Sequence, residues 1–91
     1  MELKDKQQYT TQQKLQIIAN ALNKKMGEEI DFNKYQCRVY LAYDYNSKFI
    51  TQLCRVDPFK AGGVIYCLHK DFRKIALEKI GEEELEKYLK E

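Results

Sequence analysis

Three cysteines and one histidine are the residues with the most obvious chemical potential in this 91-residue chain. Cys37, Cys54, Cys67 and His69 are of the types that bind zinc, and a histidine can also activate a cysteine nucleophile. Every cysteine, however, falls inside a segment with strand character rather than on a turn, and no third residue can be named that would orient His69. We therefore interpret the cysteines as small buried hydrophobic residues and expect no catalysis, no metal and no other cofactor.

The segments that would position these residues lie between residues 36 and 68, a stretch rich in tyrosine, valine, isoleucine and cysteine. Turn-forming residues divide it into three apolar runs, which predict strands over residues 36–43, 48–56 and 63–68. The connections are too short for parallel crossovers, so we expect an antiparallel meander.

Alternation of side chains predicts which face of each strand is buried. In the first strand, the set expected to face the core is Cys37, Val39, Leu41 and Tyr43, and the set expected to point away is Arg38, Tyr40 and Ala42. The second strand is ambiguous, because two alternating sets compete for the inside. These sets are Phe49, Thr51 and Leu53, and Ile50, Cys54 and Val56.

A helix is predicted over Thr11–Met26. Thr10 and Gln13 have capping-box spacing, and Gly27 is placed to end the helix in a left-handed conformation. The apolar residues at helical spacing form one face: Leu15, Ile18, Ala19, Leu22 and Met26. The opposite face carries neutral amide side chains, which we interpret as a solvated surface.

Two further helices are predicted at the C-terminal end. The first is capped by His69 or Asp71, stopped by Gly81 and buried through Phe72, Ile75, Ala76 and Ile80. The second, EEELEKYLKE, directs Leu85, Tyr88 and Leu89 inward. The predicted fold class is therefore α+β, a three-stranded antiparallel meander packed against an N-terminal helix and a C-terminal helix pair, in the order α-β-β-β-α-α.

Length and composition limit the classes of protein to consider. The length allows one domain, residues 1–91, of which we expect residues 1–9 to be frayed. No apolar run approaches the length of a bilayer span, and no secretion signal is indicated, so we expect a cytoplasmic location and no membrane partner. Sixteen basic and fourteen acidic residues give a net charge of +2, which argues neither for nor against a polyanionic partner.

Several motifs resemble a group of small bacteriophage and mobile-element proteins without an assigned activity. They are Asp31-Phe32-Asn33, Gly63-Val64-Ile65-Tyr66-Cys67 and Ile80-Gly81-Glu82-Glu83-Glu84-Leu85-Glu86-Lys87-Tyr88. In that group, an aromatic-rich hairpin leads into a GxIYF strand and a helix ending IGEExLxKY. This chain departs from the pattern at Cys67 and by lacking tryptophan. The resemblance implies a phage context, and hence the cytoplasm of a host cell, but no reaction.

The main functional hypothesis is a non-enzymatic binding protein. Seven tyrosines are more than so small a core can hide, and exposed tyrosine and arginine are typical anchors of protein interfaces. The residues predicted to bind the partner are Arg38, Tyr40, Tyr43, Tyr45 and Arg55. The expected partner is a host protein that the chain inhibits, for instance in a defence system such as CRISPR. Association of two copies as a homodimer stays open.

The alternative hypothesis is a nucleic-acid-binding module. The predicted α-β-β-β-α order is that of double-stranded-RNA-binding domains. Lys70, Arg73 and Lys74 lie at the start of the second predicted helix, where those domains contact phosphates. A near-neutral net charge favours weak phosphate affinity and therefore makes this the second hypothesis.

Overall fold

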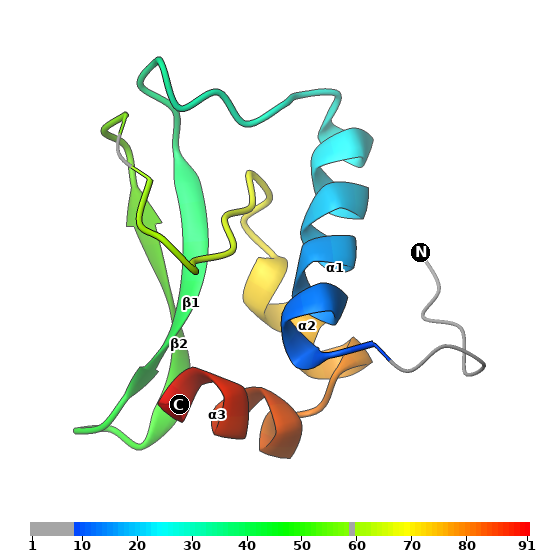
Figure 1. Ribbon diagram of the computed structural model, residues 1–91, viewed down its shortest axis with the longest axis vertical. Helices are drawn as coiled ribbons and strands as arrows, with labels where there is room; N and C mark the ends of the chain where they lie inside the picture. The colour runs from blue at the N-terminus through cyan, green and yellow to red at the C-terminus, as the bar shows by residue number, and fades with distance from the viewer. Residues whose placement is uncertain (1–8, 59) are drawn as a thin grey trace.

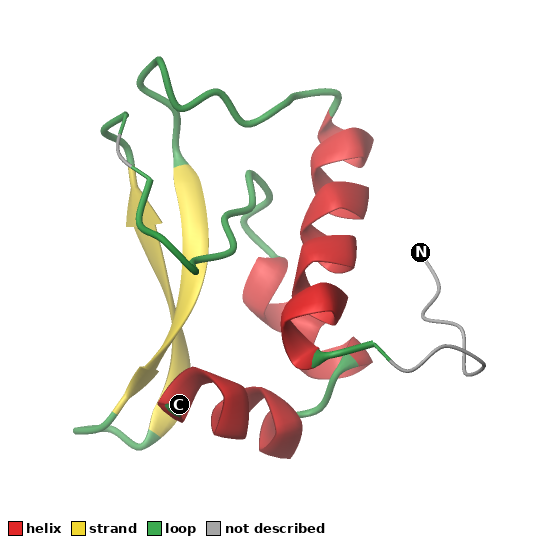
Figure 2. Ribbon diagram, in the orientation of Figure 1, coloured by secondary structure: helices red, strands yellow, loops and turns green. Residues whose placement is uncertain are grey.

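The computed structural model describes residues 9–58 and 60–91, which form a hairpin on one side and helices on the other (Figures 1 and 2). The elements in chain order are α1 (Thr11–Met26), β1 (Arg38–Asp44), β2 (Phe49–Arg55), α2 (Phe72–Lys79) and α3 (Glu82–Lys90). The predicted frayed end, apart from Tyr9, and Phe59 of the predicted turn lie outside the described residues. Within those residues, no helix is long and apolar enough to cross a membrane.

The predicted three-stranded meander is wrong. The described residues contain a two-stranded antiparallel sheet, and the element order is α-β-β-α-α. The segment 63–68, predicted as the third strand, touches β1 through a single bridge between Cys67 and Val39. At this bridge, each residue donates its backbone N–H to the carbonyl of the other, at 2.7 and 2.9 Å.

The backbone around this pair is bonded elsewhere. The next residues that could exchange hydrogen bonds with β1 in an antiparallel ladder are Ile65 and His69, and the N–H of His69 donates to Sγ of Cys67 at 3.4 Å instead. The N–H of Leu68, on the edge that faces away from β1, donates to Oδ1 of Asn23 on α1 at 2.8 Å. The hydroxyl of Tyr66 accepts the N–H of Ala61, at 3.2 Å, and holds the preceding loop in a turn. The segment therefore bridges β1 and α1 without following β1.

The register of the hairpin decides which face of β2 is buried. Ile50 pairs with Tyr43 and is buried beneath the helices, whereas Phe49 and Leu53 point to the other face and are exposed. Of the two competing sets, the one containing Ile50 therefore faces inward. Only Ile50 of that set is buried, because Cys54 and Val56 lie beyond the helices and are exposed.

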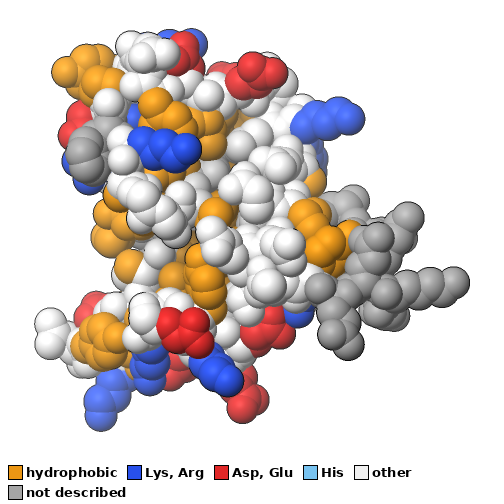
Figure 3. All heavy atoms as spheres, in the orientation of Figure 1, with side chains coloured by type: hydrophobic (Ala, Val, Ile, Leu, Met, Phe, Trp, Pro, Cys, Tyr) orange, Lys and Arg blue, Asp and Glu red, His pale blue; other side chains and the backbone are white. Residues whose placement is uncertain are grey.

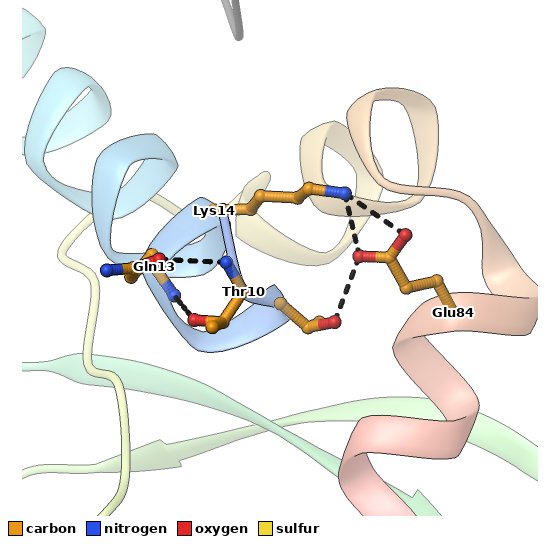
Figure 4. Close-up of polar contacts among 5 residues, drawn as sticks. Thr10, Gln13, Lys14 and Glu84 are labelled. Carbon is orange, nitrogen blue, oxygen red and sulfur yellow. Dashed lines mark hydrogen bonds and ion pairs between the residues drawn. The ribbon is translucent and has the colours of Figure 1, made fainter. Parts of the chain in front are cut away.

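The prediction of α1 is confirmed, including both ends. The hydroxyl of Thr10 accepts the N–H of Gln13 at 3.1 Å, and Oε1 of Gln13 accepts the N–H of Thr10 at 2.8 Å (Figure 4). Gly27 ends the helix with a φ of 74°, where a side chain would be strained. The apolar face is buried except for Met26, which is 44% exposed, so its predicted burial is wrong.

A polar contact fastens α1 to α3. Nζ of Lys14 donates to both carboxylate oxygens of Glu84, at 2.9 and 3.1 Å, and the hydroxyl of Thr11 donates to the same carboxylate at 2.9 Å (Figure 4). The hydrogen bond from Lys14 lowers the pKa of Glu84 below its ordinary value. The first turns of α1 and α3 are thus held together at the surface.

The predicted C-terminal helix pair is confirmed. Asp71 stands at the N-cap of α2, but its side chain makes no capping hydrogen bond in the described chain. Gln52 of β2 supplies the cap instead, because its Oε1 accepts the N–H of Arg73 at 2.8 Å and its Nε2 donates to the carbonyl of Lys70 at 2.7 Å. Gly81 separates the two helices with a φ of 98°.

The core lies between the helices and the inner face of the hairpin. Its buried members come from every element and from the segment before α2: Leu15, Ile18, Ala19, Leu22, Val39, Leu41, Ile50, Cys67, Phe72, Ala76 and Leu85. Tyr88 and Leu89 pack against this cluster while partly exposed. The inner face of the hairpin thus packs against the helices through Val39, Leu41 and Ile50, and the exposed part of the other face is available as a binding surface.

Candidate functional site

Exposed hydrophobic side chains follow the hairpin from its turn along β2. Tyr45 in the turn is 65% exposed, Phe49 41%, Leu53 42% and Val56 51%. Phe49 and Leu53 lie on the same face of β2, and Leu53 pairs with Tyr40 across the strands. Figure 3 shows hydrophobic atoms at the surface on the side of the molecule that the hairpin forms. We call Tyr40, Phe49 and Leu53 the outer hairpin surface.

The loop after β2 covers one end of this face. The ring of Tyr66 packs edge-on against the ring of Tyr40, with 5.6 Å between the ring centroids, and against Phe32 at the same distance. Tyr66 itself is buried. Tyr40, predicted to be a contact residue on an open face, is therefore only partly exposed and contributes its free edge next to Leu53.

Arg38 lies on the face of β1 that alternation predicted, but this face is covered at Arg38, so its predicted availability to a partner is wrong. The side chain is completely buried, with its guanidinium carbon 5.0 Å from the centroid of the Phe32 ring. Its Nη2 donates to the backbone carbonyl of Asp57. Its Nε and Nη1 have no hydrogen-bond partner within residues 9–58 and 60–91. Arg38 is therefore buried under Phe32 on the outer face of β1 and is not available to a partner.

Tyr43 and Tyr45 lie together at the turn end of the hairpin. Their rings are packed edge-on with 4.9 Å between the centroids, and Nζ of Lys90 on α3 lies 4.5 Å from the centroid of Tyr43. Tyr43 packs against the core, whereas Tyr45 projects outward. Only Tyr45 of this pair is well placed to contact another molecule.

Arg55 lies at the opposite end of β2 and forms an ion pair with Asp57. Its Nε donates to Oδ1 of Asp57 at 2.6 Å, and Nη2 donates to Oδ2 at 3.3 Å. The contact is at the surface, so the guanidinium can exchange Asp57 for a carboxylate of a partner at a small change in free energy.

The three predicted phosphate contacts do not form a cluster of free cations. Nε of Arg73 donates to the backbone carbonyl of Ile50 at 2.6 Å, and its guanidinium carbon lies 6.0 Å from the centroid of the Phe49 ring. Lys70 and Lys74 are exposed. Arg73 thus covers the edge of β2 and borders the outer hairpin surface.

The predicted burial of all three cysteines is correct only for Cys67. Cys37 and Cys54 are exposed at the end of the hairpin, with 2.7 Å between their sulfur atoms. Nδ1 of His69 accepts the N–H of Asp71 at 3.1 Å and so faces its own backbone. Within the described part of the chain, no three Cys, His, Asp or Glu side chains come close enough to hold a metal ion.

A second candidate surface is a cleft beside α1. The sequence predicts that the amide face of this helix, which lines the cleft, is solvated. It has a volume of about 700 Å³ and lies between the amide face of α1, the linker after it and the loop before α2. Asn20 and Lys24 line one wall, and Phe32, Lys60 and Tyr66 line the other. Nε2 of Gln16 donates a hydrogen bond to Oδ1 of Asn20 at 2.8 Å, so these two amide side chains already have a partner on α1 itself.

Comparison with known proteins identifies no relative of this chain. No protein-family model, curated protein or solved structure matches the chain.

Proposed function

We propose that this chain is a non-enzymatic binding protein that recognises a host protein and inhibits it by occupying its surface. The observation that carries the proposal is the exposure of Phe49 and Leu53, two large hydrophobic residues on one face of an edge strand. Hydrophobic residues grouped at a surface and bordered by polar ones mark sites of protein interaction. The phage resemblance favours a host protein as the partner.

The side chains around this surface suit a protein interface. Tyr45 extends the apolar surface toward the turn, and Arg55 and Arg73 border it with charge. Interfaces combine such an apolar centre with a polar rim, and aromatic and arginine side chains supply most of the binding free energy. The proposed contacts are therefore Tyr45, Phe49 and Leu53, with Tyr40 and Arg55 at the margin.

The nucleic-acid alternative loses its main support. It depended on a three-stranded sheet, and the described residues contain two strands. It also needed Arg73 for phosphate, whereas that side chain is bonded to the carbonyl of Ile50. Lys70 and Lys74 remain exposed. Two cations provide few of the phosphate contacts on which the affinity for nucleic acid depends.

The proposal is tested by capture of the partner from a host lysate, with and without nuclease. The tagged chain is compared with Leu53→Lys, which places a charge at the centre of the outer hairpin surface. We expect a protein that survives nuclease treatment and that binds Leu53→Lys roughly tenfold or more weakly, because an interface anchor contributes about 1–3 kcal/mol.

Met26→Lys is the matched control, because Met26 is as exposed as Leu53 but lies at the end of α1. It should bind like the parent chain. Asn20→Lys, which fills the cleft beside α1, tests the other surface. Normal binding by Leu53→Lys together with loss of binding by Asn20→Lys would show that the partner contacts the cleft and not the outer hairpin surface. Capture that disappears with nuclease would replace the protein partner with a nucleic acid.

A further inference from the structure

Two exposed thiols meet at the end of the hairpin that carries Arg55. Sγ of Cys37 and Sγ of Cys54 are 2.7 Å apart, which is less than 1 Å beyond the roughly 2.05 Å of a disulfide bond. Both residues are at the surface. The proposed binding function uses neither side chain.

The strand register brings these thiols together. Val39 pairs with Cys54, and Cys37 precedes Val39 by two residues, so Cys37 and Cys54 are diagonal neighbours on the same face of the hairpin. The backbone on both sides is held: Gln36 donates its N–H to the carbonyl of Val56 at 3.1 Å, and Val39 is bonded to Cys67. The approach of the two sulfurs is therefore built into the pairing of the chain.

The third cysteine cannot join this pair. Cys67 is completely buried, and its sulfur lies 4.0 Å from the backbone carbonyl of Ala19 on α1. Burial also raises the pKa of the Cys67 thiol, so this residue stays protonated and unreactive. Of the three cysteines in the chain, one pair alone is both close and accessible.

We infer that Cys37 and Cys54 form a reversible intramolecular disulfide by exchange with a small disulfide such as oxidised glutathione. The thiolate of one cysteine attacks a sulfur of the small disulfide, breaks its S–S bond and releases one small thiolate. The second protein thiolate, after giving its proton to water, attacks the mixed disulfide and releases the other small thiolate. Two protein thiols are oxidised, and one small disulfide is reduced to two thiols.

The hydrogen bond with Cys37, followed by burial, raises the pKa of the Cys54 thiol. Both cysteines are exposed, so a small disulfide can reach either sulfur atom, and the other protein thiol then resolves the mixed disulfide.

The disulfide would join the end of the linker after α1 to β2, directly beside Leu53. The cross-link closes a loop that contains the whole hairpin and restricts the unfolded chain. The oxidised protein should therefore be more stable, with a midpoint of thermal unfolding higher by roughly 10–25 °C. It should also hold β2 more firmly at the base of the outer hairpin surface.

The test uses the reduced full-length chain in glutathione buffers of increasing oxidising strength. Remaining thiols are blocked by alkylation, and the protein is analysed by intact mass and peptide mapping. We expect a monomer that loses two alkylation sites and yields a peptide linking Cys37 to Cys54. Cys67→Ala should form the same link, whereas Cys54→Ser should accumulate a mixed disulfide with glutathione on Cys37.

Two results would overturn the inference. One is a monomer that, even in the most oxidising buffer, is still alkylated at all three cysteines. The other is a disulfide found only between two molecules, which would show that the two thiols do not meet within one chain. The unfolding midpoint then measures how much the link stabilises the fold.

Discussion

β1 and β2 have the same length, seven residues each, and pair residue by residue, yet they have opposite relations to the surface. β1 has three fully buried positions, Arg38, Val39 and Leu41, and no exposed one. β2 has one buried position, Ile50, and exposes Phe49, Leu53 and Cys54. β1 therefore contributes mainly to the core, and β2 presents side chains to solvent.

Position in the sheet explains this difference. β1 has β2 on one edge and the Cys67 bridge on the other, and its outer face is covered at one end by Phe32 and Tyr66. β2 is an edge strand, and its first half is tied to α2: Nε of Arg73 donates to the carbonyl of Ile50, and Oε1 of Gln52 accepts the N–H of Arg73. A covered strand contributes stability, and an exposed edge strand is free to contribute binding.

The largest expected effect is on β1. Leu41→Ala removes a buried side chain from the core cluster and leaves a cavity, so we expect the free energy of unfolding to fall by about 2–5 kcal/mol. Urea denaturation measures this change. A loss below about 1 kcal/mol would contradict the buried position of Leu41 and with it the contrast between the strands.

A smaller effect is expected at Arg38, on the other face of β1. Arg38→Ala removes packing against Phe32 and should lower the free energy of unfolding by roughly 1–3 kcal/mol. Arg38→Met keeps most of the volume and removes a buried charge whose Nε and Nη1 lack partners in the described chain. We expect this variant to be more stable than Arg38→Ala. Equal losses in both would mean that the site needs the charge.

The third effect tests how β2 is anchored. Gln52→Ala removes the acceptor for the N–H of Arg73 and should cost about 1 kcal/mol, as the loss of a helix cap does. Gln52→Glu keeps an acceptor and should cost less. Hydrogen exchange at the first turn of α2 checks the mechanism, because the amide of Arg73 should exchange faster in Gln52→Ala. Unchanged exchange there would show that Gln52 is not the cap.

The smallest effect is expected at Leu53. Leu53→Ala should change the free energy of unfolding by less than about 0.5 kcal/mol, because the side chain is largely exposed. Measured under the same conditions as Leu41→Ala, it completes the comparison between the strands. A loss as large as that of Leu41→Ala would show that Leu53 belongs to the core and would remove it from the proposed binding surface.

Local patterns in the sequence were sufficient for the helices and for the hairpin. Thr10, Gln13 and Gly27 specify the ends of α1 through contacts between residues close in sequence. The Asp44 turn is equally local, since its Oδ1 accepts the N–H of Asn46 at 3.0 Å. Such contacts depend on the spacing of residues, which the sequence states directly.

The candidate site, in contrast, was only partly predictable. Composition predicts Tyr45 and Arg55 as contacts, and both lie at the surface, whereas alternation does not decide whether Phe49 and Leu53 point outward. Alternation assigns two faces to a strand without saying how many of them are covered. The burial of Arg38 under Phe32 depends on a linker that packs back onto the sheet, and no periodicity reports that contact.

The sequence by itself determined both ends of α1 and the turn of the hairpin, because capping, turns and amphipathic spacing act over a few neighbouring residues. The tertiary structure decided the rest. Residues 63–68 bridge β1 at Cys67 and α1 through the hydrogen bond from the N–H of Leu68 to Asn23, and both of these partners are distant in the sequence. The pairing of Cys37 with Cys54 likewise followed from the register of two strands. These outcomes depend on contacts between residues that are far apart in the sequence. The spacing of residues along the chain does not show which of these distant contacts will form.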